Sequence, residues 1–303
     1  MSLRTFFENK YHESLNYYRY FFDDLNEYGN PEQADEAFYF IHGFDGSPGQ
    51  IRFAIPSLFQ KFKDRFYIRS LFLPEFSVST PIWEKYSPEN QSLRESKINE
   101  DLCDLAKKFD KVSVVASSTG FYDFLPVYPH LSKEIQKSLQ LFWVASAPDY
   151  ADDSMWEKLF FPLNGFEYND FRWFALPNSN LLTFINPEAS LTHNWKFAAQ
   201  NRILFKHDLE SRFKVLGSSW TYLSSDCMNW LLNHCTENIT APIDIKAYVL
   251  SATKDGYWQG QSIPEMKQVI NKYITPQSMI WKDNSHLWVN TPENISELLS
   301  LAT

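Results

Sequence analysis

Short apolar runs rich in β-branched and aromatic residues alternate along the chain with segments of helical periodicity. The runs predict strands at 36–44, 65–74, 111–117, 139–148, 244–255 and 278–283. The segments between them predict helices at 49–64, 92–110, 119–138, 262–274 and 291–302. This order, with apolar strands, is typical of a mostly parallel sheet flanked by helices on both faces. The predicted fold class is therefore α/β.

Two helix predictions depend on local signals. Pro56 has to lie in the first turns of the helix at 49–64, because proline inside a helix would kink it. Ser92, with Glu95 three residues later, predicts the N-cap of the helix at 92–110.

The strand and helix alternation stops after Pro148 and resumes near residue 244. Because both flanks belong to one sheet, we expect a core of residues 1–148 and 241–303 with a helical, aromatic-rich cap inserted at 149–240. The aromatic density of the cap fits the roof of an apolar pocket, and equally helices packed on the core. For the N-terminal segment, the pattern leaves an edge strand and an amphipathic helix over 4–25 both open.

Composition and charge narrow the function classes. The chain has 303 residues, 44% of them hydrophobic, with a formal net charge of −9 and no basic stripe, so neither disorder nor nucleic-acid binding is expected. No apolar run approaches the ~20 residues that a transmembrane helix needs. The three cysteines form no C-x-x-C pair and the N-terminus lacks a signal-like apolar stretch, which indicates a cytoplasmic protein. No metal, phosphate-loop or dinucleotide motif is present, so no cofactor is expected.

The stretch KVSVVASSTGFYDF, at 111–124, predicts a strand that turns directly into a helix. Such a turn needs small residues two positions before and two after its centre, because the backbones there approach neighbouring strands closely. Ser118 meets this condition through Ala116 and Gly120. Ser117 would place the β-branched Val115 and Thr119 at the same positions, so the turn is predicted to centre on Ser118.

The stretch from Ala116 to Gly120 resembles the G-x-S-x-G nucleophile elbow of the α/β-hydrolase superfamily, in which some lipases also carry alanine first. The stretch FIHGFDG, at 40–46, resembles the superfamily loop whose H-G pair precedes an oxyanion donor. The resemblance implies oxyanion donors at the backbone N–H groups of Phe44 and Thr119. His42 is expected to be structural, bonding to the backbone of its own loop.

In this superfamily the nucleophile is followed along the chain by an acid and then a histidine. The resemblance implies Asp255 as the acid, at the end of a predicted strand, and His286 as the base, just after the last one. Asp149 and Asp283 also follow strands and are rivals for the acid.

The function that these residues imply is acyl transfer from an ester or thioester with an apolar acyl or alcohol group, through an acyl-enzyme intermediate. An acyltransferase with the same triad remains an alternative, as does a hydrolase fold kept as a non-catalytic binding module. The expected partner is a small apolar molecule, and the sequence does not define the oligomeric state.

Overall fold

A computed structural model describes most of the chain outside the N-terminal segment and the central insertion. The described residues are 26–43, 48, 51, 54–73, 86–150, 220–258, 261–284, 286 and 289–302, with the backbone alone for 220–226 and Gly256. The segment 4–25, for which an edge strand and an amphipathic helix are both open, lies outside these residues. Most of the expected cap at 149–240 also lies outside them.

The described residues form a seven-stranded sheet in the order β1-β3-β2-β4-β5-β6-β7. All neighbouring strands run parallel except β1, which pairs antiparallel with β3. The strands are β1 (Glu27–Tyr28), β2 (Glu36–Ile41), β3 (Phe66–Ser70), β4 (Val112–Ser117), β5 (Leu139–Val144), β6 (Lys246–Ala252) and β7 (Ser278–Lys282). The predicted α/β class and mostly parallel sheet are confirmed.

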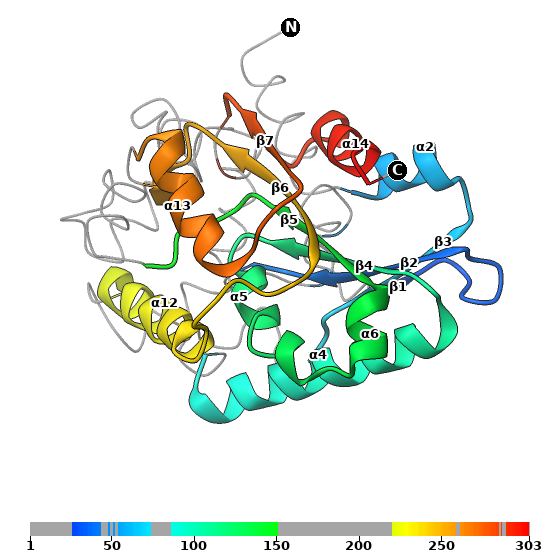
Figure 1. The fold of residues 1–303 in the computed structure, drawn as a ribbon, viewed down its shortest axis with the longest axis horizontal. Coiled ribbons are helices and arrows are strands. Elements are labelled where there is room, and N and C mark those ends of the chain that lie inside the picture. The colour runs from blue at the N-terminus through cyan, green and yellow to red at the C-terminus, as the bar shows by residue number, and fades with distance from the viewer. Residues whose placement is uncertain are drawn as a thin grey trace, which may run out of the picture.

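Helices cover both faces of the sheet, and Figure 1 shows α2 and α14 on one side and α4, α5 and α12 on the other. The helices of the described part are α2 (Ile55–Phe62), α4 (Pro88–Lys108), α5 (Gly120–Phe124), α6 (Lys133–Ser138), α12 (Trp220–Thr236), α13 (Ile263–Tyr273) and α14 (Pro292–Ser300). Two short 3-10 helices are η2 (Tyr128–His130) and η6 (Gly256–Trp258). The chain thus forms three layers, with the sheet in the middle.

Two apolar clusters, one on each face, account for central strands that are buried on both sides. Because successive side chains in a strand point to opposite faces, adjacent rows of the sheet belong to different clusters. The row facing α4 and α5 contains Tyr39, Val114, Leu141 and Ala247. The next row, facing α2 and α14, contains Phe40, Val115, Phe142 and Tyr248.

The predicted start of the helix at 92–110 is wrong. Helix α4 begins at Pro88, and Ser87 is its N-cap, accepting a hydrogen bond from the Asn90 N–H at 3.4 Å. Ser92 lies inside the helix and its hydroxyl donates to the carbonyl of Pro88. Proline is well suited to the first helical position because the N–H there has no partner in the helix.

The single helix predicted over 119–138 is also wrong, because the chain forms α5, η2 and α6 in succession. Pro126 and Pro129 lie between these elements, and each lacks the backbone N–H that a continuous helix requires. Helix α6 then starts afresh, with the Ser132 hydroxyl accepting from the Ile135 N–H at 3.3 Å.

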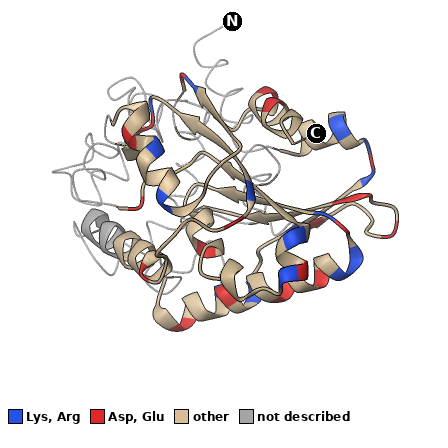
Figure 2. Cartoon of the chain, viewed as in Figure 1, with Lys and Arg blue, Asp and Glu red and all other residues tan. Residues whose placement is uncertain are grey.

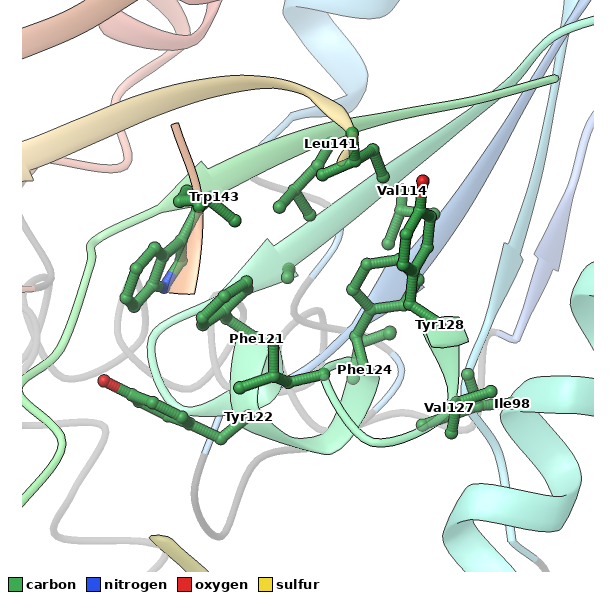
Figure 3. Packing of buried hydrophobic residues seen from close by; sticks show 14 of the residues in the cluster. Ile98, Val114, Phe121, Tyr122, Phe124, Val127, Tyr128, Leu141 and Trp143 are labelled. Carbon is green, nitrogen blue, oxygen red and sulfur yellow. The ribbon is translucent and has the colours of Figure 1, made fainter. Parts of the chain in front are cut away.

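Aromatic side chains hold the short helix α5 against the strands β4 and β5 (Figure 3). The ring of Phe121 stacks on Trp143 with centroids 4.0 Å apart. The hydroxyl of Tyr122 donates to the carbonyl of Ala147, just beyond β5, at 3.0 Å. Tyr122, Phe121 and Trp143 are fully buried, so α5 is fixed to the end of the sheet on which Ser118 lies.

Strands β5 and β6 are neighbours, so residues 145–245 connect two adjacent parallel strands. Helix α12, the last helix before β6, packs against α5 (Figure 1). Its side chains in the core cluster are Met228, Leu231, Leu232 and Cys235. The C-terminal part of the inserted segment therefore contributes to the core of the sheet domain.

Charged residues of both signs are interspersed along α4 (Figure 2). Lys97 pairs with Asp101 at 3.0 Å and Lys108 with Asp104 at 3.0 Å, each four residues apart. Spacing of this kind supports the helix, although Asp101 is itself buried and accepts a hydrogen bond from the Tyr39 hydroxyl at 3.1 Å. In the part of the chain that the structure describes, no helix is long and apolar enough to cross a membrane.

Candidate active site

The chain turns sharply at Ser118, directly after β4. Ser118 has a φ of 54°, in the left-handed region that residues other than glycine rarely adopt. The turn is held by β5, since the Ser118 N–H donates to the Val144 carbonyl at 2.8 Å and the Trp143 indole N–H donates to the Ser118 carbonyl at 2.8 Å. Strain of this kind, of order 1–3 kcal/mol, is characteristic of functional sites.

Gly120 lies where the turn passes closest to β2. A Cβ at this position would lie 2.5 Å from the carbonyl oxygens of both Ile41 and His42. Ala116 is fully buried in β4, between Ile41 of β2 and Trp143 of β5. The close approach expected from the sequence is therefore present at Gly120.

Replacing Gly120 by alanine is expected to lower the free energy of unfolding by about 1–3 kcal/mol, the usual cost of overpacking. The atoms in the way are the backbone oxygens of Ile41, the last residue of β2, and of His42 just after it, and backbone oxygens cannot rotate aside as a side chain would. Urea unfolding measures the change. Gly43→Ala is the comparison, because its Cβ would lie 2.9 Å from the Cβ of Ser118 and 3.1 Å from the Ser117 carbonyl oxygen, a milder overlap that is expected to cost less stability. A Gly120→Ala protein as stable as wild type would contradict this packing.

Ser118, His286 and Asp255 form one hydrogen-bonded chain. The Ser118 hydroxyl donates to Nε2 of His286 at 2.8 Å, and Nδ1–H of His286 donates to Oδ2 of Asp255. His286 and Asp255 are 3% and 4% exposed, while Ser118 is partly exposed. The carboxylate selects the imidazole tautomer in which Nε2 accepts, which is the form a general base requires.

The loop after β6 fixes the Asp255 carboxylate on its second oxygen. The Tyr257 N–H donates to Oδ1 of Asp255 at 2.9 Å. The fully buried Trp258 anchors the loop, because its indole N–H donates to the carbonyl of Ser146 at 2.9 Å. The end of β5 thus supports both the turn at Ser118 and the loop of Asp255.

The two rival carboxylates have other partners. Asp149 pairs with Lys272 at 2.8 Å and accepts from the Tyr273 hydroxyl at 2.8 Å. Asp283 pairs with Lys254 at 3.0 Å, and the hydrogen bonds from Lys254 hold the pKa of the Asp283 carboxyl below its usual value. Neither carboxylate contacts His286 among the contacts of the described residues.

The structure describes only one of the two residues that were expected to supply oxyanion donors. Phe44 lies outside the described residues. Thr119 is buried, and its Oγ1 has no hydrogen-bond partner within the described ranges. A buried hydroxyl left unpaired costs about 1–3 kcal/mol, and such groups are often found at functional sites.

His42 donates from Nδ1 to the carbonyl of Gly43 at 3.1 Å, the backbone contact expected of a structural histidine.

The structure contains a buried ion pair between α4 and α5 that the sequence analysis does not predict. Arg94 of α4 binds Asp123 of α5 through two nitrogens, and Gln91 donates to the same carboxylate at 3.1 Å. All three side chains are almost fully buried. Burial alone would lower the pKa of the Arg94 guanidinium. The negative charge of Asp123 outweighs this effect, so the pKa of Arg94 is raised above its usual value. The only sequence signal is that Arg94 occupies the apolar face of its helix, four residues before Ile98.

No group of three or more His, Cys, Asp or Glu side chains suitable for a metal ion occurs among the residues that the structure describes.

No protein-family model matches the chain, and the curated proteins contain no match. Solved structures do resemble it. A lipase-esterase related protein from Clostridium acetobutylicum is 13% identical, with 91% of this chain and 97% of that one covered and a TM-score of 0.51. Serine hydrolase CCSP0084 from Cycloclasticus zankles is 14% identical, covering 91% and 92%, with a TM-score of 0.53. The Cif epoxide hydrolase from Acinetobacter nosocomialis is 16% identical, covering 91% and 83%, with a TM-score of 0.52.

At these identities the likeness concerns the fold alone. The chain has the α/β-hydrolase fold. The names of these three structures span different reactions, so the fold does not select the chemistry and the site has to carry the argument.

Proposed function

We propose that the protein is a serine hydrolase that cleaves an ester or thioester with an apolar acyl or alcohol group. One observation carries the proposal. The Ser118 hydroxyl lies 2.8 Å from Nε2 of His286, whose other nitrogen is bound to the buried carboxylate of Asp255. A serine hydroxyl is a weak nucleophile unless a base of this kind removes its proton.

The proposed reaction has two steps. Oγ of Ser118 attacks the substrate carbonyl while its proton passes to Nε2 of His286, and Asp255 stabilises the imidazolium. The imidazolium then protonates the leaving alcohol or thiol, which departs and leaves the acyl group on Ser118. Water attacks the acyl-enzyme with His286 again as base, and the acid is released.

The tetrahedral oxyanion needs donors near Ser118. We propose the backbone N–H groups of Thr119 and Phe44 for this role. The Thr119 N–H adjoins the nucleophile and has no hydrogen-bond partner among the described residues. A single donor of this type contributes on the order of 10²–10³ to the rate.

The apolar character of the substrate is inferred from the inserted segment. Aromatic residues are dense at 156–174, within the cap that we propose for 149–240. The insertion follows β5, whose end supports the turn at Ser118. A cap at this place would face the nucleophile with apolar side chains.

We also propose that the protein acts in the cytoplasm. The support is the sequence, whose three cysteines form no C-x-x-C pair and cannot pair completely, which favours a reducing compartment over a disulfide framework.

Hydrolysis of p-nitrophenyl esters, from acetate to dodecanoate, tests the proposed function. We expect turnover by wild type, an initial burst of p-nitrophenol from the acyl-enzyme, and a rate that rises with acyl length. Added alcohols that capture the acyl group more efficiently than water would instead identify an acyltransferase. A folded wild-type protein that turns over none of these esters would favour a binding module.

A further inference from the structure

Tyr257 contacts both the acid and the base of the proposed triad. Its backbone N–H donates to Oδ1 of Asp255, and its ring lies against the imidazole of His286 with centroids 4.5 Å apart and planes at 54°. The ring is half-buried and packs against the core cluster of the α4 and α5 face. One residue thus contacts both members of the proposed triad other than the nucleophile.

The position of the Tyr257 ring is fixed by its neighbours. Tyr257 lies within η6, between Asp255 and the anchored Trp258. The Trp258 N–H donates to the Asp255 carbonyl at 3.2 Å, which closes the turn. The loop that presents the carboxylate therefore also fixes the backbone of Tyr257 beside His286.

The imidazole of His286 is in contact through both of its nitrogens and through the Tyr257 ring. Among the described residues, Nδ1 is bound to Asp255 and Nε2 to Ser118. Lys254 and Asp283, on the same loops, pair with each other at 3.0 Å. Within the described ranges, the titratable groups in contact with the imidazole are Asp255, Ser118 and Tyr257.

We propose that Tyr257 is a positioning residue, whose ring orients the imidazole of His286 and stabilises the imidazolium that forms when Ser118 gives up its proton. This inference rests on the proposed function. The face of an aromatic ring carries partial negative charge and attracts a cation within about 6 Å of its centroid. The attraction is strongest where water is excluded, and His286 is 3% exposed.

The test is the rate of labelling by a fluorophosphonate probe as a function of pH. In this reaction Oγ of Ser118 bonds to phosphorus, fluoride leaves, and the hydroxyl proton passes to His286. We expect Tyr257→Leu and Tyr257→Met to label about 5- to 30-fold more slowly than wild type at the pH optimum. The acid limb of their profiles should move to lower pH, because loss of the ring disfavours the protonated imidazole.

Tyr257→Phe is the matched control, since it keeps the ring and lacks only the hydroxyl. It should label within about twofold of wild type with an unmoved acid limb. Thermal melting identifies which of the two ring-free variants folds as wild type does, and that variant is the one compared.

Three outcomes would overturn the inference. Ring-free variants that label as fast as wild type, or that slow without any shift of the acid limb, exclude a role for the ring in charge stabilisation. A Tyr257→Phe protein as slow as Tyr257→Leu assigns the effect to the hydroxyl. A folded wild-type protein that does not label at all overturns the proposed function itself, which distinguishes the two failures.

Discussion

Replacing Ser118 by alanine, His286 by alanine, or both together is expected to lower ester hydrolysis by the same factor, on the order of 10⁵–10⁶. The two side chains share one proton through a hydrogen bond of 2.8 Å, so removing either removes the same activated nucleophile. Initial rates of p-nitrophenyl acetate hydrolysis by the three variants measure this directly.

Asp255→Asn and Ser117→Ala complete this series. The Asn variant is expected to lose on the order of 10⁴ in rate, because its amide does not select the correct imidazole tautomer. Ser117 ends β4 and is not part of the hydrogen-bonded chain, so Ser117→Ala should stay within a few-fold of wild type. Losses that add up in the Ser118 and His286 double variant would contradict the proposed triad.

Replacing Arg94 by methionine is expected to lower the free energy of unfolding by about 3–5 kcal/mol. The change leaves the carboxylate of Asp123 buried without its main partner, and Gln91 alone cannot neutralise it. Urea unfolding monitored by circular dichroism gives the value. Because Asp123 lies on α5, three residues after Gly120, labelling of Ser118 should slow as well.

The double variant Arg94→Met, Asp123→Leu is the control for this prediction. Removing both charges replaces the ion pair by apolar contact, which is often close to neutral in stability. We therefore expect the double variant to be more stable than Arg94→Met alone. A double variant whose loss equals the sum of the two single losses would show that the pair is not coupled.

The central strands of the fold could be predicted because they are buried on both faces. In Val112–Ser117 and Leu139–Val144 apolar residues fall on both faces of the strand and every residue is buried, which is typical of a parallel sheet covered on both sides. Strand β1 has only two residues, and its pairing with β3 depends on contacts distant in sequence. The break in the helix predicted at 119–138 falls at Pro126 and Pro129, neither of which can donate the backbone hydrogen bond that a continuous helix requires.

The candidate site likewise has one part that the local sequence predicts and another that it does not. The turn at Ser118 depends on its immediate neighbours Ala116 and Gly120, so the local sequence was enough to locate it. The support beneath and beside it depends on distant partners. Arg94 and Asp123 are 29 residues apart, and Trp258 and Ser146 are 112 apart. Side-chain pairs at such separations leave no periodic pattern for a single sequence to show.

The most direct test of the central claim is intact-mass analysis after reaction with a fluorophosphonate probe. We compare wild type, Ser118→Ala and the neighbouring Ser117→Ala, each shown to be folded. The proposed triad predicts one adduct on wild type and on Ser117→Ala and none on Ser118→Ala. An adduct that persists on Ser118→Ala, or a folded wild type that remains unmodified, would contradict it.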